Sequence, residues 1–206
     1  MSRFQYLIFP IEGSVTERLQ RYYGELIGAA HKVQFVALGL EDALRIGDLS
    51  SAIEHVEYHV ENYLSRVYQL RDRAIAAAET AYGGSLSDLR HRDRRPALSS
   101  RLEARLPKVT SPLFSLIQLI DQDIQTHNTL THRTALHLHV SADDGQMLDP
   151  STVLMGISDH PDRKKIEKTL RTDLADFVEP YTQRIEAVFH ATIELANAFD
   201  LFTNGD

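Results

Sequence analysis

One stretch of the chain carries side chains that could handle protons and phosphates. Residues 121–133 read Asp-Gln-Asp-Ile-Gln-Thr-His-Asn-Thr-Leu-Thr-His-Arg. At 100° per residue, one row of a helix would hold four of them, namely Asp121, Gln125, Asn128 and His132. A carboxylate and two amides in line with an imidazole can hold that imidazole in one tautomer. The row therefore predicts an acid–base site centred on His132.

His127 lies off this row. It continues from Ile120 and Ile124, so it is expected to point partly toward the core. Asn128, Thr129 and Thr131 are mediocre helix formers within one turn, which indicates that helix propensity is sacrificed there. The plain alternative is that the row is solvated helix surface and that His127 is a satisfied core histidine.

A second candidate is the basic segment, residues 85–110. It carries seven cationic and three acidic side chains between Ser85 and Lys108, in a chain whose formal net charge is -7. Arg90, Arg92, Arg94 and Arg95 form its densest part and are the candidate phosphate-binding residues. The alternative is a solvated loop.

The turn from His127 to His132 resembles the signature of HEPN domains, which is Arg-Asn, three variable residues and His. The second helix, from His59 through Tyr63 and Arg66 to Asp72, resembles the long early helix of these domains. The resemblance spans roughly residues 14 to 202. It implies a bundle of four or five helices that cleaves RNA without a metal or other cofactor. Its site is shared across a homodimer, often in defence or toxin–antitoxin systems.

The resemblance assigns roles to individual residues. His132 matches the catalytic histidine and Asn128 the polar residue that orients the site, whereas His127 stands where the family has arginine. Histidine is charged only when protonated, and Arg133 projects about 100° away from His132. A second register, Arg133 with His139, lacks the asparagine and crosses the expected helix end.

As a nuclease, the protein would use His132 to deprotonate a ribose 2′-hydroxyl that attacks the adjacent phosphorus. His127 or the second copy's His132 would protonate the leaving oxygen, with Arg133 or the basic segment holding the phosphates.

The runner-up interpretation is an inactive HEPN-like module that binds a partner, such as a nucleotidyltransferase-type antitoxin protein. A third reading is a metal site at His55 and His59, completed by His127 or His190. No Glu-x-x-His pair of the kind used by di-iron bundles accompanies them.

Four apolar stripes with steps of three and four predict four long helices. The first covers residues 15–44, with a Ser14–Glu17 capping box and a stop at Gly47, or a break near Gly39. The second starts at a Ser51–Glu54 box and ends at Gly83-Gly84. The third starts at Ser111-Pro112 and ends near Thr134.

The last helix is predicted to start around residues 158–161 and to bend at Pro180. Between it and the third helix, residues 135–157 are expected to be a loop or a small β-hairpin turning at Asp144-Gly145. Short helices are allowed in the basic connection 85–110. The predicted fold is an all-α, up-and-down bundle of four long helices, in one domain covering residues 1–206 with its core in 14–202.

Composition places the chain in the ordinary globular class, with 43% hydrophobic and 25% charged residues. The absence of cysteine excludes disulfides, thiol catalysis and cysteine-ligated zinc. No stretch approaches the ~20 apolar residues of a membrane helix, and residues 4–9 are too short for a signal peptide. We therefore expect a cytoplasmic protein without a membrane partner.

Overall fold

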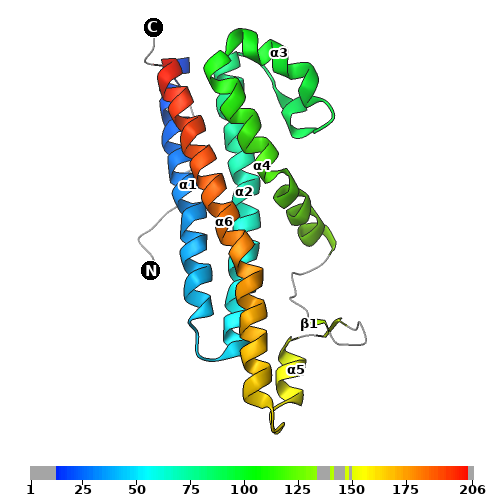
Figure 1. Cartoon of the computed structure of the whole chain (residues 1–206). Coiled ribbons are helices and arrows are strands. Elements are labelled where there is room, and N and C mark those ends of the chain that lie inside the picture. Colours follow the sequence, from blue (N-terminus) through cyan, green and yellow to red (C-terminus); the bar gives the residue numbers. More distant parts are fainter. Residues whose placement is uncertain (1–12, 134–139, 142–146, 149, 204–206) are drawn as a thin grey trace, which may run out of the picture.

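The computed structural model describes residues 13–133, 140–141, 147–148 and 150–203. Its four long helices are α1 (Val15–Leu44), α2 (Leu49–Tyr82), α4 (Pro107–Arg133) and α6 (Arg163–Thr203). They run alternately down and up, with α1 and α4 each packed between α2 and α6 (Figure 1). The predicted all-α bundle of four long helices is confirmed.

Helix α1 begins as the sequence predicts. The Ser14 hydroxyl accepts the Glu17 amide, and the Glu17 carboxylate accepts the Ser14 amide at 2.7 Å. The helix continues through Gly39 to Leu44, so the alternative break near Gly39 is wrong. Arg171 of α6 donates to the carbonyls of Ile46 and Gly47, satisfying acceptors where α1 ends.

Helix α2 begins two residues before the predicted Ser51–Glu54 box. Asp48 is the N-cap, and its Oδ2 accepts the Ser51 amide at 2.8 Å. The carboxylate thus takes the place expected for the Ser51 hydroxyl, which falls in the first turn instead. The predicted end is confirmed, because Gly83 adopts the left-handed conformation (φ 72°).

The basic connection contains two short helices, the 3-10 helix η1 (Ser87–Arg90) and α3 (Arg95–Arg105). Helix α4 then starts at Pro107, four residues before the predicted Ser111. Proline suits a first helical position, so Pro107 can open the helix, and Pro112 is accommodated inside it. The predicted end near Thr134 agrees with the observed end at Arg133.

The segment between α4 and α6 holds a short antiparallel pairing of β1 (Val140–Ser141) with β2 (Met147–Leu148). This agrees with the predicted hairpin, while its Asp144-Gly145 turn lies outside the described residues. Helix α5 (Pro150–Gly156), which packs against α2, was not predicted from the sequence. Helix α6 runs through Pro180 without ending.

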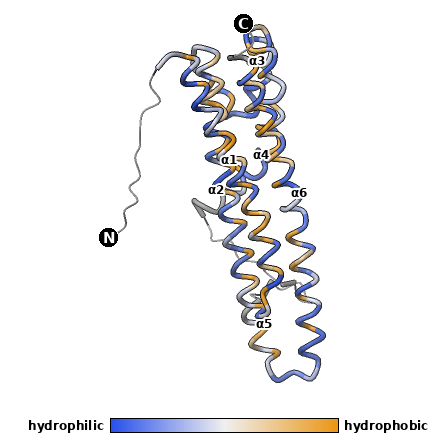
Figure 2. The backbone as a smooth tube through the Cα atoms, turned by 90° about the vertical axis from the view of Figure 1, so that its left-hand side faces the viewer, coloured by the Kyte–Doolittle hydropathy of each residue, from blue (hydrophilic) through white to orange (hydrophobic). Residues whose placement is uncertain are grey.

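The core follows the predicted stripes. The predicted stripes of α2 and α4 are buried throughout. They consist of Ile53, Val56, Val60, Tyr63, Val67, Leu70, Ala74 and Ala78 in α2 and of Leu113, Leu116, Ile117, Ile120 and Ile124 in α4. Hydrophobic and hydrophilic stretches accordingly alternate along each tube in Figure 2. The predicted apolar stripe of the first helix begins at Val15, which is 45% exposed because it is the first residue of α1. Among the described helices, none combines the length and apolar character needed to span a membrane.

Candidate functional site

The polar row of α4 faces a pocket of about 640 Å³. Asp121, Gln125 and Asn128, three members of the predicted row, line it together. Five arginines from five different elements or loops also line it, so we call it the arginine pocket. Its arginines are Arg71, Arg90, Arg92, Arg95 and Arg184.

Arg95 fixes one wall of the pocket. Its Nη1 and Nη2 donate to the two carboxylate oxygens of Asp121 at 2.5 and 2.8 Å, and its Nε donates to the Leu89 carbonyl at 2.7 Å. Arg95 is only 8% exposed. These three hydrogen bonds connect the start of α3 with η1 and with the middle of α4. They hold the basic segment in a fixed position beside the polar row.

Arg184 of α6 reaches the pocket from beneath α4. Its Nε donates to Asp123 Oδ2 at 2.7 Å, and its Nη2 donates to the Leu119 carbonyl at 2.7 Å. The buried Tyr63 hydroxyl donates to the same Asp123 oxygen at 2.9 Å. Burial raises the pKa of the Asp123 carboxyl above its usual value, although both hydrogen bonds act against that rise. Burial and the nearby carboxylate raise the pKa of Tyr63, so its hydroxyl remains a donor.

Arg71 and Arg90 share one carboxylate. Both approach Asp72 Oδ1 at 3.4 Å, and Arg71 also lies over the Tyr68 ring, 4.5 Å from its centroid. The exposed Arg92 pairs with no carboxylate of the described residues. Four of the five guanidinium groups therefore pair with three carboxylates, those of Asp72, Asp121 and Asp123. The pocket carries two positive charges in excess.

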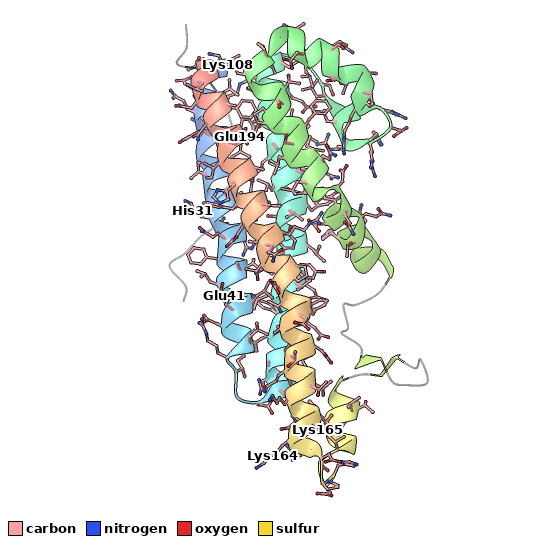
Figure 3. All side chains as sticks on the ribbon, in the orientation of Figure 1. His31, Glu41, Lys108, Lys164, Lys165 and Glu194 are labelled. Carbon is pink, nitrogen blue, oxygen red and sulfur yellow. The ribbon has the colours of Figure 1, made fainter. Side chains whose placement is uncertain are left out.

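Three of the lysines lie at the ends of the bundle. Figure 3 places Lys108 at one end of the bundle and Lys164 and Lys165 at the other. Lys164 precedes Arg184 by 20 residues of the same helix, which corresponds to about 30 Å.

The predicted catalytic residues are only partly brought together. Asn128 is exposed and lines the pocket, whereas His127 is half-buried and stacks on the Tyr68 ring at 5.0 Å between centroids. His132 and Arg133 form the end of α4, one turn beyond Asn128, and their side chains lie outside the described part. His139, the second register's histidine, is also outside it.

The predicted RNA-binding arginines divide into three kinds. Arg90 and Arg92 line the pocket with side chains open to solvent. Arg95 lines it but is engaged with Asp121. Arg94 points elsewhere, since it pairs with Asp88 at 3.2 Å and is not part of the pocket lining.

Sequence reasoning missed Arg71, Arg184 and Asp123. Asp123 lies three residues after Ile120 and next to Ile124, at helical positions that face the core. A carboxylate at such a position requires a cationic partner, which was the available signal.

The described residues do not complete the metal site predicted at His55 and His59. The His55 and His59 rings are 6.5 Å apart, and His127 is stacked on Tyr68 instead of joining them. Across the described ranges, no group of three or more histidine, aspartate or glutamate side chains is placed to hold a metal ion.

Comparisons of this chain with protein-family models, curated proteins and solved structures return no match. The HEPN resemblance accordingly stays a prediction from the motif at residues 127–132. The geometry of the arginine pocket stands independently of it.

Proposed function

We propose that this protein binds RNA and holds RNA phosphates in the arginine pocket. The observation that carries the proposal is the excess of positive charge gathered there by a chain of net charge -7. Arginine stays charged at physiological pH and can bind one phosphate through two parallel hydrogen bonds. Arg90 and Arg92 are the main candidates for phosphate contacts, because both line the pocket and remain open to solvent.

Two supports favour RNA over a small inorganic anion. The pocket continues along α4 toward Asn128, and His132 lies one turn further in the same helical row. A chain of phosphates, unlike a single anion, could follow that row. The HEPN resemblance of residues 127–132 independently implies an RNA ligand.

The test of binding is a matched charge reversal. The double variant Arg90→Glu/Arg92→Glu removes the two solvent-open pocket cations, and Lys164→Glu/Lys165→Glu makes the same change in net charge about 30 Å away. Titration of a labelled single-stranded RNA should show at least tenfold weaker binding for the pocket variant and less than a twofold change for the control. The slope of log affinity against log salt should fall by about 1.4 for two lost phosphate contacts.

Two outcomes would contradict the proposal. Equal loss of affinity in both variants would mean that net charge, and not the pocket, attracts RNA. No binding by the unaltered protein would reject RNA and leave the protein-partner reading, with an antitoxin-like protein as ligand.

The second candidate function is metal-independent cleavage of the bound RNA. It is favoured by one observation, that Asn128 lines the pocket one turn before His132. In this reaction His132 takes the proton of a 2′-hydroxyl, whose oxygen forms a bond to phosphorus while the bond to the 5′-oxygen breaks. His127, or His132 of a second copy of the chain, returns a proton to that leaving oxygen.

Cleavage is tested with purified protein and RNA in excess chelator. His132→Ala should abolish product formation, while His190→Ala, at an exposed position of α6, should leave it unchanged. If the unaltered protein binds RNA without cutting it, the protein is a binding module. Equal cleavage by the His132→Ala protein would remove this histidine from the reaction.

A further inference from the structure

The arginine pocket has two chemically different walls. One consists of guanidinium groups, which only donate hydrogen bonds. The other is formed by four primary amides of α4, which we call the amide row: Gln118, Gln122, Gln125 and Asn128. Their spacing of four, three and three residues places them on one face of the helix.

A primary amide both donates and accepts hydrogen bonds, and this property distinguishes a nucleobase from a phosphate as its ligand. A phosphate group offers acceptors only, so it can pair with the NH2 groups of Gln118 and Gln122 but not with their carbonyl oxygens. A nucleobase edge offers donors and acceptors side by side, and glutamine and asparagine are among the side chains that pair with it through two hydrogen bonds. The amide row therefore complements a base, and the arginines complement its phosphate.

The size of the pocket agrees with this division. Its volume of about 640 Å³ far exceeds the need of one phosphate and lies within the range of pockets that enclose small organic ligands. Bases within a duplex already use their pairing edges, whereas unpaired bases can turn outward and present them to a protein.

We propose that the amide row reads the base of one unpaired nucleotide whose phosphate lies on Arg90 and Arg92. Gln118 and Gln122 are the specificity-determining residues, because both are exposed and precede the turn that carries the candidate catalytic side chains. The bidentate pair of Asp121 with Arg95 joins the two walls directly and fixes their distance. This inference rests on the proposed RNA binding.

The experiment compares four homopolymer RNA octamers and one duplex of equal length, at constant salt. The unaltered protein should prefer one base over the weakest by about tenfold, and should bind the duplex more weakly than the favoured single strand. Gln118→Ala/Gln122→Ala should remove that base preference and leave the salt slope unchanged. Alanine suits exposed helical positions, so the fold should be kept.

The matched control is Gln20→Ala/Gln34→Ala, which removes two exposed glutamines of α1 and should keep the preference. Equal binding of all four octamers by the unaltered protein would overturn the inference while RNA binding itself stands. A base preference that survives Gln118→Ala/Gln122→Ala would also overturn it. Absence of any RNA binding would defeat both proposals together.

Discussion

Two polar rows of this protein look alike in sequence and differ in structure. On α2, His55, His59 and the residues that follow lie three or four apart beside an apolar stripe, as do Asp121, Gln125 and Asn128 on α4. The α2 row closes against α1, where the His59 ring lies against Gly39. The α4 row opens into the arginine pocket.

The difference lies in what faces each row. Gly39 has no side chain, so the imidazole of His59 fills the space, and its buried Nδ1 has no hydrogen-bond partner in the described part. The α4 row faces α3 and η1, which the Arg95–Asp121 pair holds in place at a fixed distance. Helical spacing thus identifies polar rows, whereas the opposite element decides whether a row becomes packing or a site.

The largest effect should come from removing Arg95, which fixes one wall of the pocket. Arg95→Ala leaves the Asp121 carboxylate without its bidentate partner, and breaking a largely buried ion pair costs about 3 kcal/mol of unfolding free energy. Chemical denaturation measures it, and RNA binding should be lost as well. The neighbouring Arg94→Ala is the control. Its pair with Asp88 is mostly exposed, so at most about 0.5 kcal/mol is expected. A loss for Arg95→Ala as small as for Arg94→Ala would contradict the assigned role.

The second-largest effect should come from removing the Tyr63 hydroxyl, which binds the same buried carboxylate of Asp123 as Arg184 does. Tyr63→Phe keeps the ring but removes the hydrogen bond to Asp123, a buried carboxylate, and should cost about 2 kcal/mol. Denaturation at neutral pH is the measurement. No loss of stability would mean that Arg184 alone satisfies this carboxylate.

The third prediction concerns the contact between His59 of the α2 row and Gly39 of α1. A Cβ at position 39 would lie within 2.6 Å of His59 Nδ1, so Gly39→Ala should destabilise the protein by about 1 kcal/mol despite the better helix propensity of alanine. Gly24→Ala, where a Cβ meets nothing within 4 Å, should instead stabilise it by up to ~1 kcal/mol. In a His59→Ala background, Gly39→Ala should also become stabilising. Unchanged destabilisation there would rule out the imidazole as the cause.

The smallest effect should be a pH dependence of folding stability that comes from His59 in the α2 row. Burial, followed by the charge of His55, lowers the pKa of His59 in the folded protein. The unfolded chain therefore binds a proton more readily, and the stability that neutral His59 provides is present above about pH 6.5 and lost as the pH falls below it. His59→Gln should flatten this part of the stability profile. An unchanged profile would place the imidazole in solvent.

Much of the fold follows from local patterns. The stripe of α2 is wholly buried, and the Ser14 cap and Gly83 terminator act as their residue types predict. The start of α4 was misplaced because Pro107 and Pro112 are both acceptable near a helix start, and local rules do not choose between them.

The site was predictable only in part. Spacing alone assembled Asp121, Gln125 and Asn128, but nothing local pairs Arg95 with Asp121, 26 residues away, or Arg184 with Asp123, 61 residues away. Those pairs depend on how the helices pack. They turn a polar row and a basic segment into one pocket.

The central claim, that RNA lies in the arginine pocket, is tested most directly by photo-crosslinking. RNA containing 4-thiouridine is irradiated with the protein, and the attached peptides are identified by mass spectrometry. We expect attachment within residues 90–95 and 118–128 that is suppressed by unlabelled RNA. Attachment confined to the lysines at the start of α6, or spread evenly over the surface, would contradict the account.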